Sequence, residues 1–234
     1  MNFFKGENMT AGYGGADIIK NCNIQVEAGE IVVVIGPNGA GKSTAMKAML
    51  GMLKLKNGSI KFNNDEITTL LPQDRVNLGI AFVPQTKNVF TGMTVEENLE
   101  MGAFLRTDEI QDTINQVYDL FPVLGEKKNQ NVSELSGGQR QQVAFGRALM
   151  TQPSILMLDE PTAGVSPIVM DNLFTRIIEV GKTGVGILMV EQNAKQALGI
   201  ANRGYVMVNG ENRMEGSGKD LLNNPDVRKS FLGG

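Results

Sequence analysis

A short glycine-rich run constrains the fold of this 234-residue chain more than any other feature. The run Gly36-Pro37-Asn38-Gly39-Ala40-Gly41-Lys42-Ser43 follows the apolar segment Ile31 to Ile35 and precedes a stretch of helical pattern. Glycines between a strand and a helix let backbone N–H groups turn inward around a phosphate, and the helix N-terminus adds its positive end. The sequence therefore predicts a strand, a phosphate-binding P-loop and a helix in this order.

The polar residues that end this run suit a nucleotide that carries Mg²⁺. The Lys42 side chain can reach the β- and γ-phosphates, and the Ser43 hydroxyl is a suitable Mg²⁺ ligand. We expect Thr44 to belong to the same site. Without a nucleotide, the Lys42 side chain is expected to meet solvent.

Short apolar runs alternate with helical stretches along the chain. Tyr205 to Val208 predicts a strand before a hairpin turn at Asn209-Gly210, and helices are expected at Lys42 to Leu53 and Ser166 to Val180. The pattern predicts a doubly wound α/β core with ligands at the carboxyl ends of its strands. Four runs are apolar throughout, as a parallel sheet covered on both faces requires: Ile31 to Ile35, Ile80 to Val83, Ile155 to Leu158 and Ile187 to Val190.

Two further regions differ from this core. The opening segment to about Gln25, together with Gly58 to Phe62, is polar enough for an antiparallel edge sheet. We expect one domain, 1–234, with core and β subdomain at about 1–90 and 151–234 and a helical subdomain at about 91–150. Within Thr94 to Met150, apolar residues recur at helical spacing: Val95, Leu99, Met101, Leu105, Ile110, Ile114, Val117 and Leu120.

The composition excludes several kinds of site and partner. The chain has no histidine, which removes the commonest metal ligand and the usual proton shuttle near neutral pH. One cysteine, Cys22, allows no internal disulfide and favours a reducing compartment. The net charge of −3 argues against a nucleic-acid partner. Since no apolar stretch approaches the ~18–20 residues of a membrane span, we expect a cytoplasmic protein that serves any membrane peripherally.

Polar residues follow two of the predicted strands. Asp159 and Glu160 end the run Ile155 to Leu158, and Gln85 comes shortly after Val83. An aspartate at such a strand end in a P-loop protein belongs to the Mg²⁺ shell. An acid pair at a strand end without a catalytic task is the alternative.

The run Leu135-Ser136-Gly137-Gly138-Gln139 lies between the P-loop and Asp159-Glu160. In this order the motifs resemble those of the ATP-binding cassette (ABC) family, the ATPase subunits that drive membrane transporters. The resemblance extends from about Tyr13 to the C-terminus. It implies ATP hydrolysis with ATP and Mg²⁺ bound, and a P-loop NTPase (RecA-like) α/β core with an antiparallel β edge subdomain and an inserted helical subdomain.

The resemblance also implies roles for single residues. Glu160 is implied to polarise the attacking water, Gln85 to touch Mg²⁺ and that water, and Tyr13 to stack on adenine. Taken alone, Gln85 is a turn residue and Tyr13 a surface tyrosine. The residues expected to bind ATP or Mg²⁺ are Tyr13, Gly36, Pro37, Asn38, Gly39, Ala40, Gly41, Lys42, Ser43, Thr44, Gln85, Ser136, Gly137, Gly138, Gln139 and Asp159.

The second glycine-rich run indicates that one chain is not sufficient. Ser136 is near a capping position of a predicted helix, Arg140 to Met150, and free N–H groups at a helix start make an anion site. In the family this site serves the nucleotide of the facing subunit, so two chains pack head to tail around two ATP molecules. The implied partners are a second ATPase subunit, either another copy of this chain or a sister ATPase, transmembrane permease subunits at the inner face of the cell membrane and, indirectly, a periplasmic solute-binding protein.

Two departures from the family pattern indicate a branch. Ser166 replaces the common aspartate of the loop after Glu160, and Gln192 replaces the histidine after the last core strand, where it would sense the γ-phosphate. With the ending Gly233-Gly234, these resemble the smaller ATPase of branched-chain amino-acid importers, or of related urea and amide importers. The alternatives are a degenerate ATPase, a cassette ATPase of DNA maintenance or translation, and a nucleotide-dependent regulator.

Overall fold

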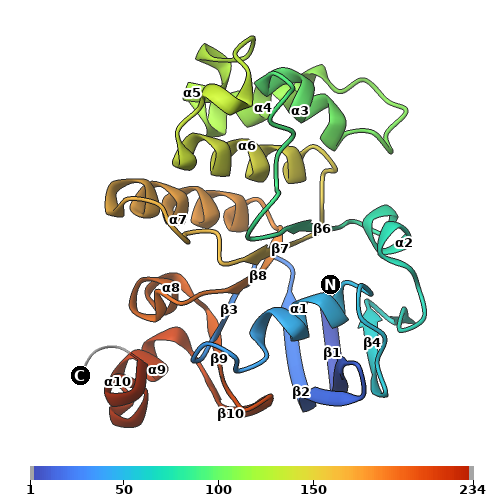
Figure 1. The fold of residues 1–234 in the computed structure, drawn as a ribbon, viewed down its shortest axis with the longest axis vertical. Helices are drawn as coiled ribbons and strands as arrows, with labels where there is room; N and C mark the ends of the chain where they lie inside the picture. Colours follow the sequence, from blue (N-terminus) through green and yellow to red (C-terminus); the bar gives the residue numbers. More distant parts are fainter. Residues whose placement is uncertain (1–2, 232–234) are drawn as a thin grey trace.

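The computed structural model describes residues 3–231, and a six-stranded sheet runs through its middle (Figure 1). Its strand order is β10-β9-β3-β8-β7-β6, and every neighbouring pair is parallel except the hairpin of β9 and β10. All the predicted core strands are confirmed. The bounds are β3 (Ile31–Ile35), β6 (Ile80–Val83), β7 (Ile155–Asp159), β8 (Gly186–Val190), β9 (Arg203–Val208) and β10 (Glu211–Gly216).

A second, antiparallel sheet is formed by the beginning of the chain, as the sequence predicts. Its strand order is β2-β1-β4-β5. The Asn212 side chain joins the two sheets, since its amide nitrogen donates to the Asn23 carbonyl oxygen at 2.9 Å and its oxygen accepts from the Asn23 N–H at 2.7 Å. The strands are β1 (Phe3–Tyr13), β2 (Ala16–Glu27), β4 (Asn57–Phe62) and β5 (Asp65–Glu66).

The central strands of the six-stranded sheet, such as β3 and β8, are buried and apolar on both faces, so successive residues of one strand enter different cores. Val32 and Val34 pack with α1 (Lys42–Met49) and the antiparallel sheet. Val33 and Ile35 pack on the other face with the helices after β7 and β8 and with the helices between β6 and β7. The helices of the second half are α7 (Pro167–Lys182), α8 (Ala194–Ile200), α9 (Gly218–Asn223) and α10 (Pro225–Phe231).

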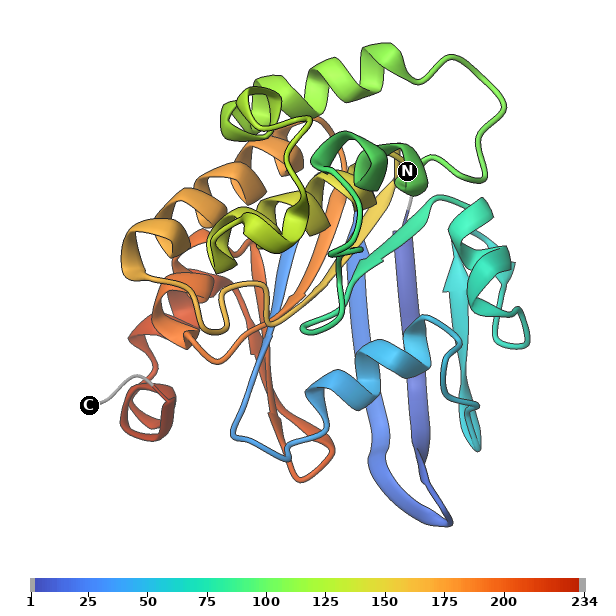
Figure 2. The same cartoon turned by 45° about the horizontal axis from the view of Figure 1, so that its top comes forward.

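The segment between β6 and β7 is helical and lies above the main sheet in Figure 1. Val95, Leu99 and Val117 are buried there as predicted, but Met101 and Leu105 are 40% and 51% exposed. Helix α3 ends at Gly102, whose backbone lies so close to the Arg147 carbonyl that no side chain fits, and the chain then leaves the helix as a loop (Figure 2). The helices are α3 (Val95–Gly102), α4 (Gln111–Leu120), α5 (Pro122–Glu126), a 3-10 turn (Val132–Glu134) and α6 (Gly137–Leu149).

Helix α1 ends at Met49, before the predicted Leu53. The local sequence ends the helix: Gly51 has a left-handed φ of 81°, and the N–H groups of Gly51 and Met52 donate to the carbonyl oxygens of Ala48 and Lys47. Arg75 of α2 (Pro72–Asn77), 1% exposed, adds hydrogen bonds to the carbonyl oxygens of Ala48 and Met49. A cation at a helix C-terminus also suits the helix dipole.

No helix within residues 3–231 has the length and apolar character needed to cross a membrane. The predicted Gly233-Gly234 signal lies outside the described residues.

Candidate nucleotide-binding and hydrolysis site

The loop between β3 and α1 lines a cavity of about 270 Å³. Gly41 caps α1 with a φ of 97°, and a Cβ there would lie 2.9 Å from the Ile19 side chain, so only glycine suits the position. The cavity therefore opens onto the N-terminus of α1, where backbone N–H groups favour an anion. The lining residues are Ile18, Asn38, Gly39, Ala40, Gly41, Lys42, Ser43, Thr44 and Glu160.

Lys42 does not meet solvent, so that expectation is wrong. Its side-chain nitrogen donates to the carbonyl oxygens of Gly36 at 2.9 Å and Pro37 at 3.2 Å, and the residue is 5% exposed. Burial lowers the pKa of Lys42, while the nearby carboxylates of Glu160 and Asp159 act in the opposite direction.

Ser43 and Asp159 come together from the start of α1 and the end of β7. The Ser43 hydroxyl donates to Oδ1 of Asp159 at 2.9 Å, and burial raises the pKa of Asp159. No cluster of three or more His, Cys, Asp or Glu side chains in residues 3–231 could hold a metal. Mg²⁺ ordinarily takes one or two protein ligands together with water and substrate phosphates. Ser43 and Asp159 provide two oxygen atoms beside the P-loop, which is the small number of protein ligands that Mg²⁺ ordinarily takes.

The Glu160 carboxylate accepts hydrogen bonds from two side chains that follow other strands, Gln85 after β6 and Gln192 after β8. Nε2 of Gln85 donates to its Oε2 at 2.7 Å, and Nε2 of Gln192 donates to its Oε1 and Oε2 at 3.0 and 2.9 Å. Glu160 has a φ of 49°, a left-handed conformation that costs a non-glycine residue roughly 1–2 kcal/mol. Such strain often accompanies function, because the surrounding structure must hold the residue in place.

A second cavity, of about 420 Å³, adjoins Glu160. Gln192 is exposed along its edge, yet its amide is hydrogen-bonded to Glu160, which excludes a merely solvent-facing role. Glu160 is the residue that lines both cavities, so its carboxylate lies between the P-loop and the loop that follows β7. The lining residues are Gln85, Glu160, Thr162, Ala163, Gly164, Val165, Met170, Glu191, Gln192 and Asn193.

The run Ser136 to Gln139 begins α6, earlier than the predicted start at Arg140. The Ser136 hydroxyl accepts from the Gln139 N–H at 3.2 Å, and the Gln139 side chain accepts from the Ser136 N–H at 3.0 Å. This capping box matches the predicted role of Ser136. Neither cavity is lined by these residues. Within one chain the structure does not bring them to the P-loop.

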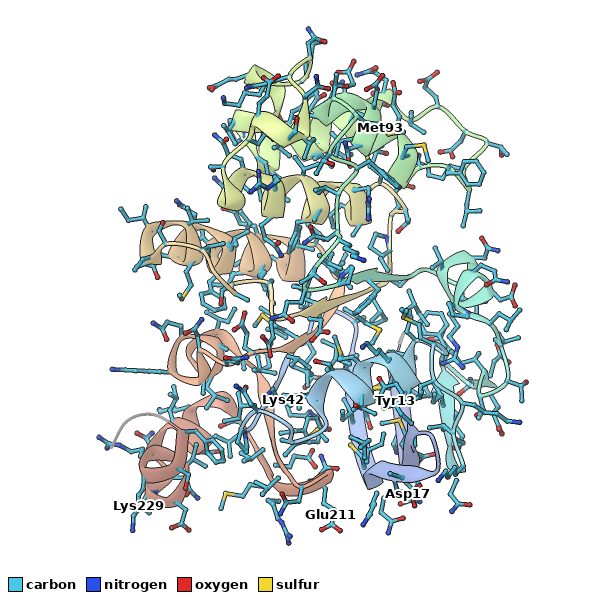
Figure 3. The ribbon with its side chains drawn as sticks, viewed as in Figure 1. Tyr13, Asp17, Lys42, Met93, Glu211 and Lys229 are labelled. Carbon is cyan, nitrogen blue, oxygen red and sulfur yellow. The ribbon has the colours of Figure 1, made fainter. Side chains whose placement is uncertain are left out.

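Tyr13 ends β1 and is 50% exposed, and the P-loop cavity is lined by Ile18 of the neighbouring strand instead. Figure 3 labels Tyr13 and Lys42 in the lower half of the molecule and Met93 in the helical part above. Ile18 was missed because a single apolar residue in a strand carries no signal. Glu191 was also missed, although an acid directly after an apolar strand repeats the pattern of Asp159.

The sequence is similar to known ABC proteins along most of its length. A family model described as "ABC transporter" matches residues 19–163. The high-affinity branched-chain amino acid transport ATP-binding protein BraG of Pseudomonas aeruginosa is 42% identical, covering 95% of this chain and 96% of its own. The probable branched-chain amino acid transport ATP-binding protein LivF of Archaeoglobus fulgidus is 38% identical, covering 96% of each chain.

Solved cassettes share the fold. The ADP conformation of MJ1267, an ATP-binding cassette of an ABC transporter, has a TM-score of 0.86 and 30% identity and covers 100% of both chains. A dimeric post-hydrolysis state of the cassette MJ0796, bound to ADP and phosphate, has a TM-score of 0.80 and 25% identity over 92% of this chain and 98% of its own. The chain belongs to the ABC transporter family, in which it is an ATP-binding, ATP-hydrolysing subunit.

Proposed function

We propose that this chain is the ATPase subunit of an importer for branched-chain amino acids. The observation that supports branched-chain amino acids as the solute is the 42% identity to BraG, which extends over nearly all of both chains. A urea or amide importer remains the second candidate, because the ATPase subunit resembles both and solute specificity lies in other subunits. The P-loop residues line a cavity that Glu160 also lines, and Gln85 is hydrogen-bonded to Glu160. These features favour an ATPase that hydrolyses its nucleotide over a regulator that only binds it.

Each part of the site has a proposed role in hydrolysis. The loop Gly36 to Gly41 and Thr44 bind the phosphates through the start of α1, and Lys42 exchanges the carbonyls of Gly36 and Pro37 for phosphate oxygens. Ser43 and Asp159, with Gln85, would hold Mg²⁺, which neutralises phosphate charge when bound. Glu160 orients and polarises the attacking water. Asp159 favours the metal because a cation offsets the burial that raises its pKa.

We assign to Tyr13 the role of stacking on the adenine ring. The residue is exposed at the tip of the β1–β2 hairpin, and Gly14 and Gly15 beside it have positive φ angles and open space around them. A ring that covers a base contributes about 1–3 kcal/mol. Ile18 lies on the same hairpin and lines the phosphate cavity, which supports an approach of the nucleotide along β2.

ABC cassettes form dimers, as MJ0796 does, and we propose a head-to-tail dimer for this chain. Ser136 and Gly137 are exposed, and a Cβ added to Gly137 would meet no atom within 4 Å. Packing inside this chain therefore does not require glycine at position 137. A nucleotide held by the partner's P-loop would require it, because close approach of a phosphate to the backbone leaves no room for a side chain.

Permease subunits would dock beside α3, and the chain would thereby lie on the inner face of the membrane. Phe90, Met101, Phe104 and Leu105 are large apolar residues that are 40–77% exposed. The Arg147 guanidinium lies 4.9 Å from the centre of the Phe90 ring. A periplasmic solute-binding protein would act only through the permeases. The division into a core with β subdomain (about 1–90 and 151–234) and a helical subdomain (about 91–150) is part of this proposal.

The test is uptake by the purified transporter. The tagged chain is isolated from its native membrane with its permeases, reconstituted in liposomes and supplied with ATP. We expect ATP-dependent uptake of leucine, isoleucine and valine, and none with Glu160→Gln. Uptake of urea or short amides without uptake of leucine would establish the second candidate.

A further inference from the structure

The Glu191 carboxylate, directly after β8, accepts hydrogen bonds on both oxygens. Oε1 accepts from the Thr162 N–H at 3.0 Å and from the Thr162 hydroxyl at 2.8 Å. Oε2 accepts from the N–H of Gln192 at 3.1 Å and from the N–H of Asn193 at 3.4 Å. One oxygen therefore binds the segment after β7, and the other binds the segment after β8.

The two segments that Glu191 joins have different positions in the site. Thr162 is 2% exposed and begins the loop whose next residues, Ala163 and Gly164, are exposed. Gln192 carries the amide that donates to Glu160. Asn193 strengthens the connection, because its Nδ2 donates to the Thr162 hydroxyl at 2.8 Å. The Glu191 carboxylate is thus the connection between an exposed loop and the group that holds Glu160.

A carboxylate at this buried position is costly unless it has several donors. Glu191 is 1% exposed, and no salt bridge in residues 3–231 includes it. An apolar residue or a glutamine would avoid the cost of burying a charge. Only a carboxylate offers two acceptor oxygens that can satisfy donors on both sides. The cost indicates a task that a neutral side chain cannot perform.

We propose that Glu191 is a positioning residue for ATP hydrolysis: its carboxylate fixes Gln192 against Glu160 and transmits the position of the Ala163–Ser166 loop to that pair. The proposal rests on the water-activating role assigned to Glu160. It requires that Glu191 change turnover far more than nucleotide affinity: no P-loop residue is hydrogen-bonded to it, and its charge reaches Lys42 only through space, as the weakest of the three carboxylates that act on that lysine.

The primary variant is Glu191→Gln. Glutamine keeps the shape but has one acceptor oxygen, so its NH₂ group must face N–H donors on one side. Misplacement of a catalytic group by about 1 Å can cost 10²-fold in rate. We expect kcat of the purified chain to fall about 10- to 100-fold, with the Kd for ATP by calorimetry changed less than about twofold. Glu215→Gln, at an exposed residue paired with Arg203, is the charge-matched control and should leave both values unchanged.

Two further measurements distinguish positioning from a structural role. Thr162→Val removes the hydroxyl donor while Thr162→Ser keeps it, so the serine variant should turn over several-fold faster than the valine variant. In the Glu160→Gln background, adding Glu191→Gln should slow hydrolysis no further, because Glu191 acts through Glu160.

Wild-type kcat in Glu191→Gln, or equal losses of kcat and ATP affinity, would overturn the proposal. So would equal rates in the two Thr162 variants, or an additive loss in the double variant. If Glu191→Gln does not fold, the two Thr162 variants decide. An inactive wild-type chain, or full turnover in Glu160→Gln, would instead refute the assigned function, which keeps the two failures distinct.

Discussion

The side-chain amide of Gln192 donates to both carboxylate oxygens of Glu160, at 3.0 and 2.9 Å. The family has a histidine where this chain has Gln192, and the sequence predicts that its amide senses the γ-phosphate. In the structure the amide holds the carboxylate that is proposed to activate water. A neutral amide can exchange one acceptor for another without any change of protonation. Release of Glu160 and contact with the nucleotide can therefore be one movement of Gln192.

Replacement of Gln192 by alanine is expected to lower turnover and spare binding. The change removes the donor to Glu160 and leaves the P-loop cavity intact, because Gln192 does not line it. We expect kcat to fall about tenfold, which corresponds to roughly 1.4 kcal/mol of transition-state stabilisation. Steady-state phosphate release and calorimetry measure the two quantities. Wild-type turnover would show that Gln192 plays no part in the reaction.

The pH profile gives a separate test of the same residue. Since the chain contains no histidine, its hydrolysis rate should show no histidine-type rise between about pH 6 and 7 beyond the effect of ATP's own ionisation. Gln192→His introduces an imidazole beside Glu160 and should introduce such a rise. Profiles of wild type and variant at saturating MgATP make the comparison. An identical profile in both proteins would remove position 192 from the rate-limiting step.

Glu160→Gln should bind MgATP, hydrolyse it very slowly and accumulate as a closed dimer. The P-loop residues are unchanged, so binding persists, while the carboxylate that polarises water is lost. Size-exclusion chromatography with ATP is the measurement, and Glu160→Gln combined with Lys42→Ala is the control that should stay monomeric. A single variant that remains monomeric with ATP bound, well above micromolar concentration, would contradict the homodimer.

Lys42→Ala should abolish tight ATP binding without unfolding the chain. The ammonium group supplies a point charge to the phosphates, and its hydrogen bonds within residues 3–231 go to carbonyls of its own loop. Calorimetry compares the variant with Lys219→Ala, which removes an exposed lysine of α9. Circular dichroism checks the fold. Unchanged affinity in Lys42→Ala would refute the phosphate site.

Asp159→Asn should stabilise the nucleotide-free chain near neutral pH. Burial raises the pKa of Asp159 above its unfolded value of about 3.9, so ionisation opposes folding and stability is lost as pH rises through the folded pKa. Asparagine keeps the acceptor for Ser43 and never ionises. We expect its Tm to exceed that of wild type by a few degrees at pH 7, about 2–4 °C per kcal/mol in a chain of this size, and the difference to shrink toward pH 4.

The same substitution should remove the additional Tm that Mg²⁺ with ATP gives the wild type, because a ligand stabilises only the state that binds it. Thermal scans with and without MgATP measure both effects. A lower Tm for Asp159→Asn at pH 7 would show that the ionised carboxylate is stabilised in the fold.

The sequence predicted well wherever local rules decide the structure. The P-loop needs glycine at positions such as Gly41, and the core strands are apolar throughout because both faces are covered. Prediction was wrong at the ends of two helices. Helix α1 stops at Met49, before the predicted Leu53, because Gly51 takes a left-handed conformation and caps the helix, a local signal that the prediction did not use. Leu105 is exposed because α3 must end where Gly102 meets Arg147.

The sequence by itself determined the family, the order of the motifs and the core strands, since each depends on residues close together in the chain. Only the tertiary structure decided what surrounds Glu160. The register of β7 and β8 sets Asp159 opposite Val190, so the residues that follow each strand, Glu160 and Gln192, reach one another. That register is set by packing of whole strands against both cores, which no short segment encodes.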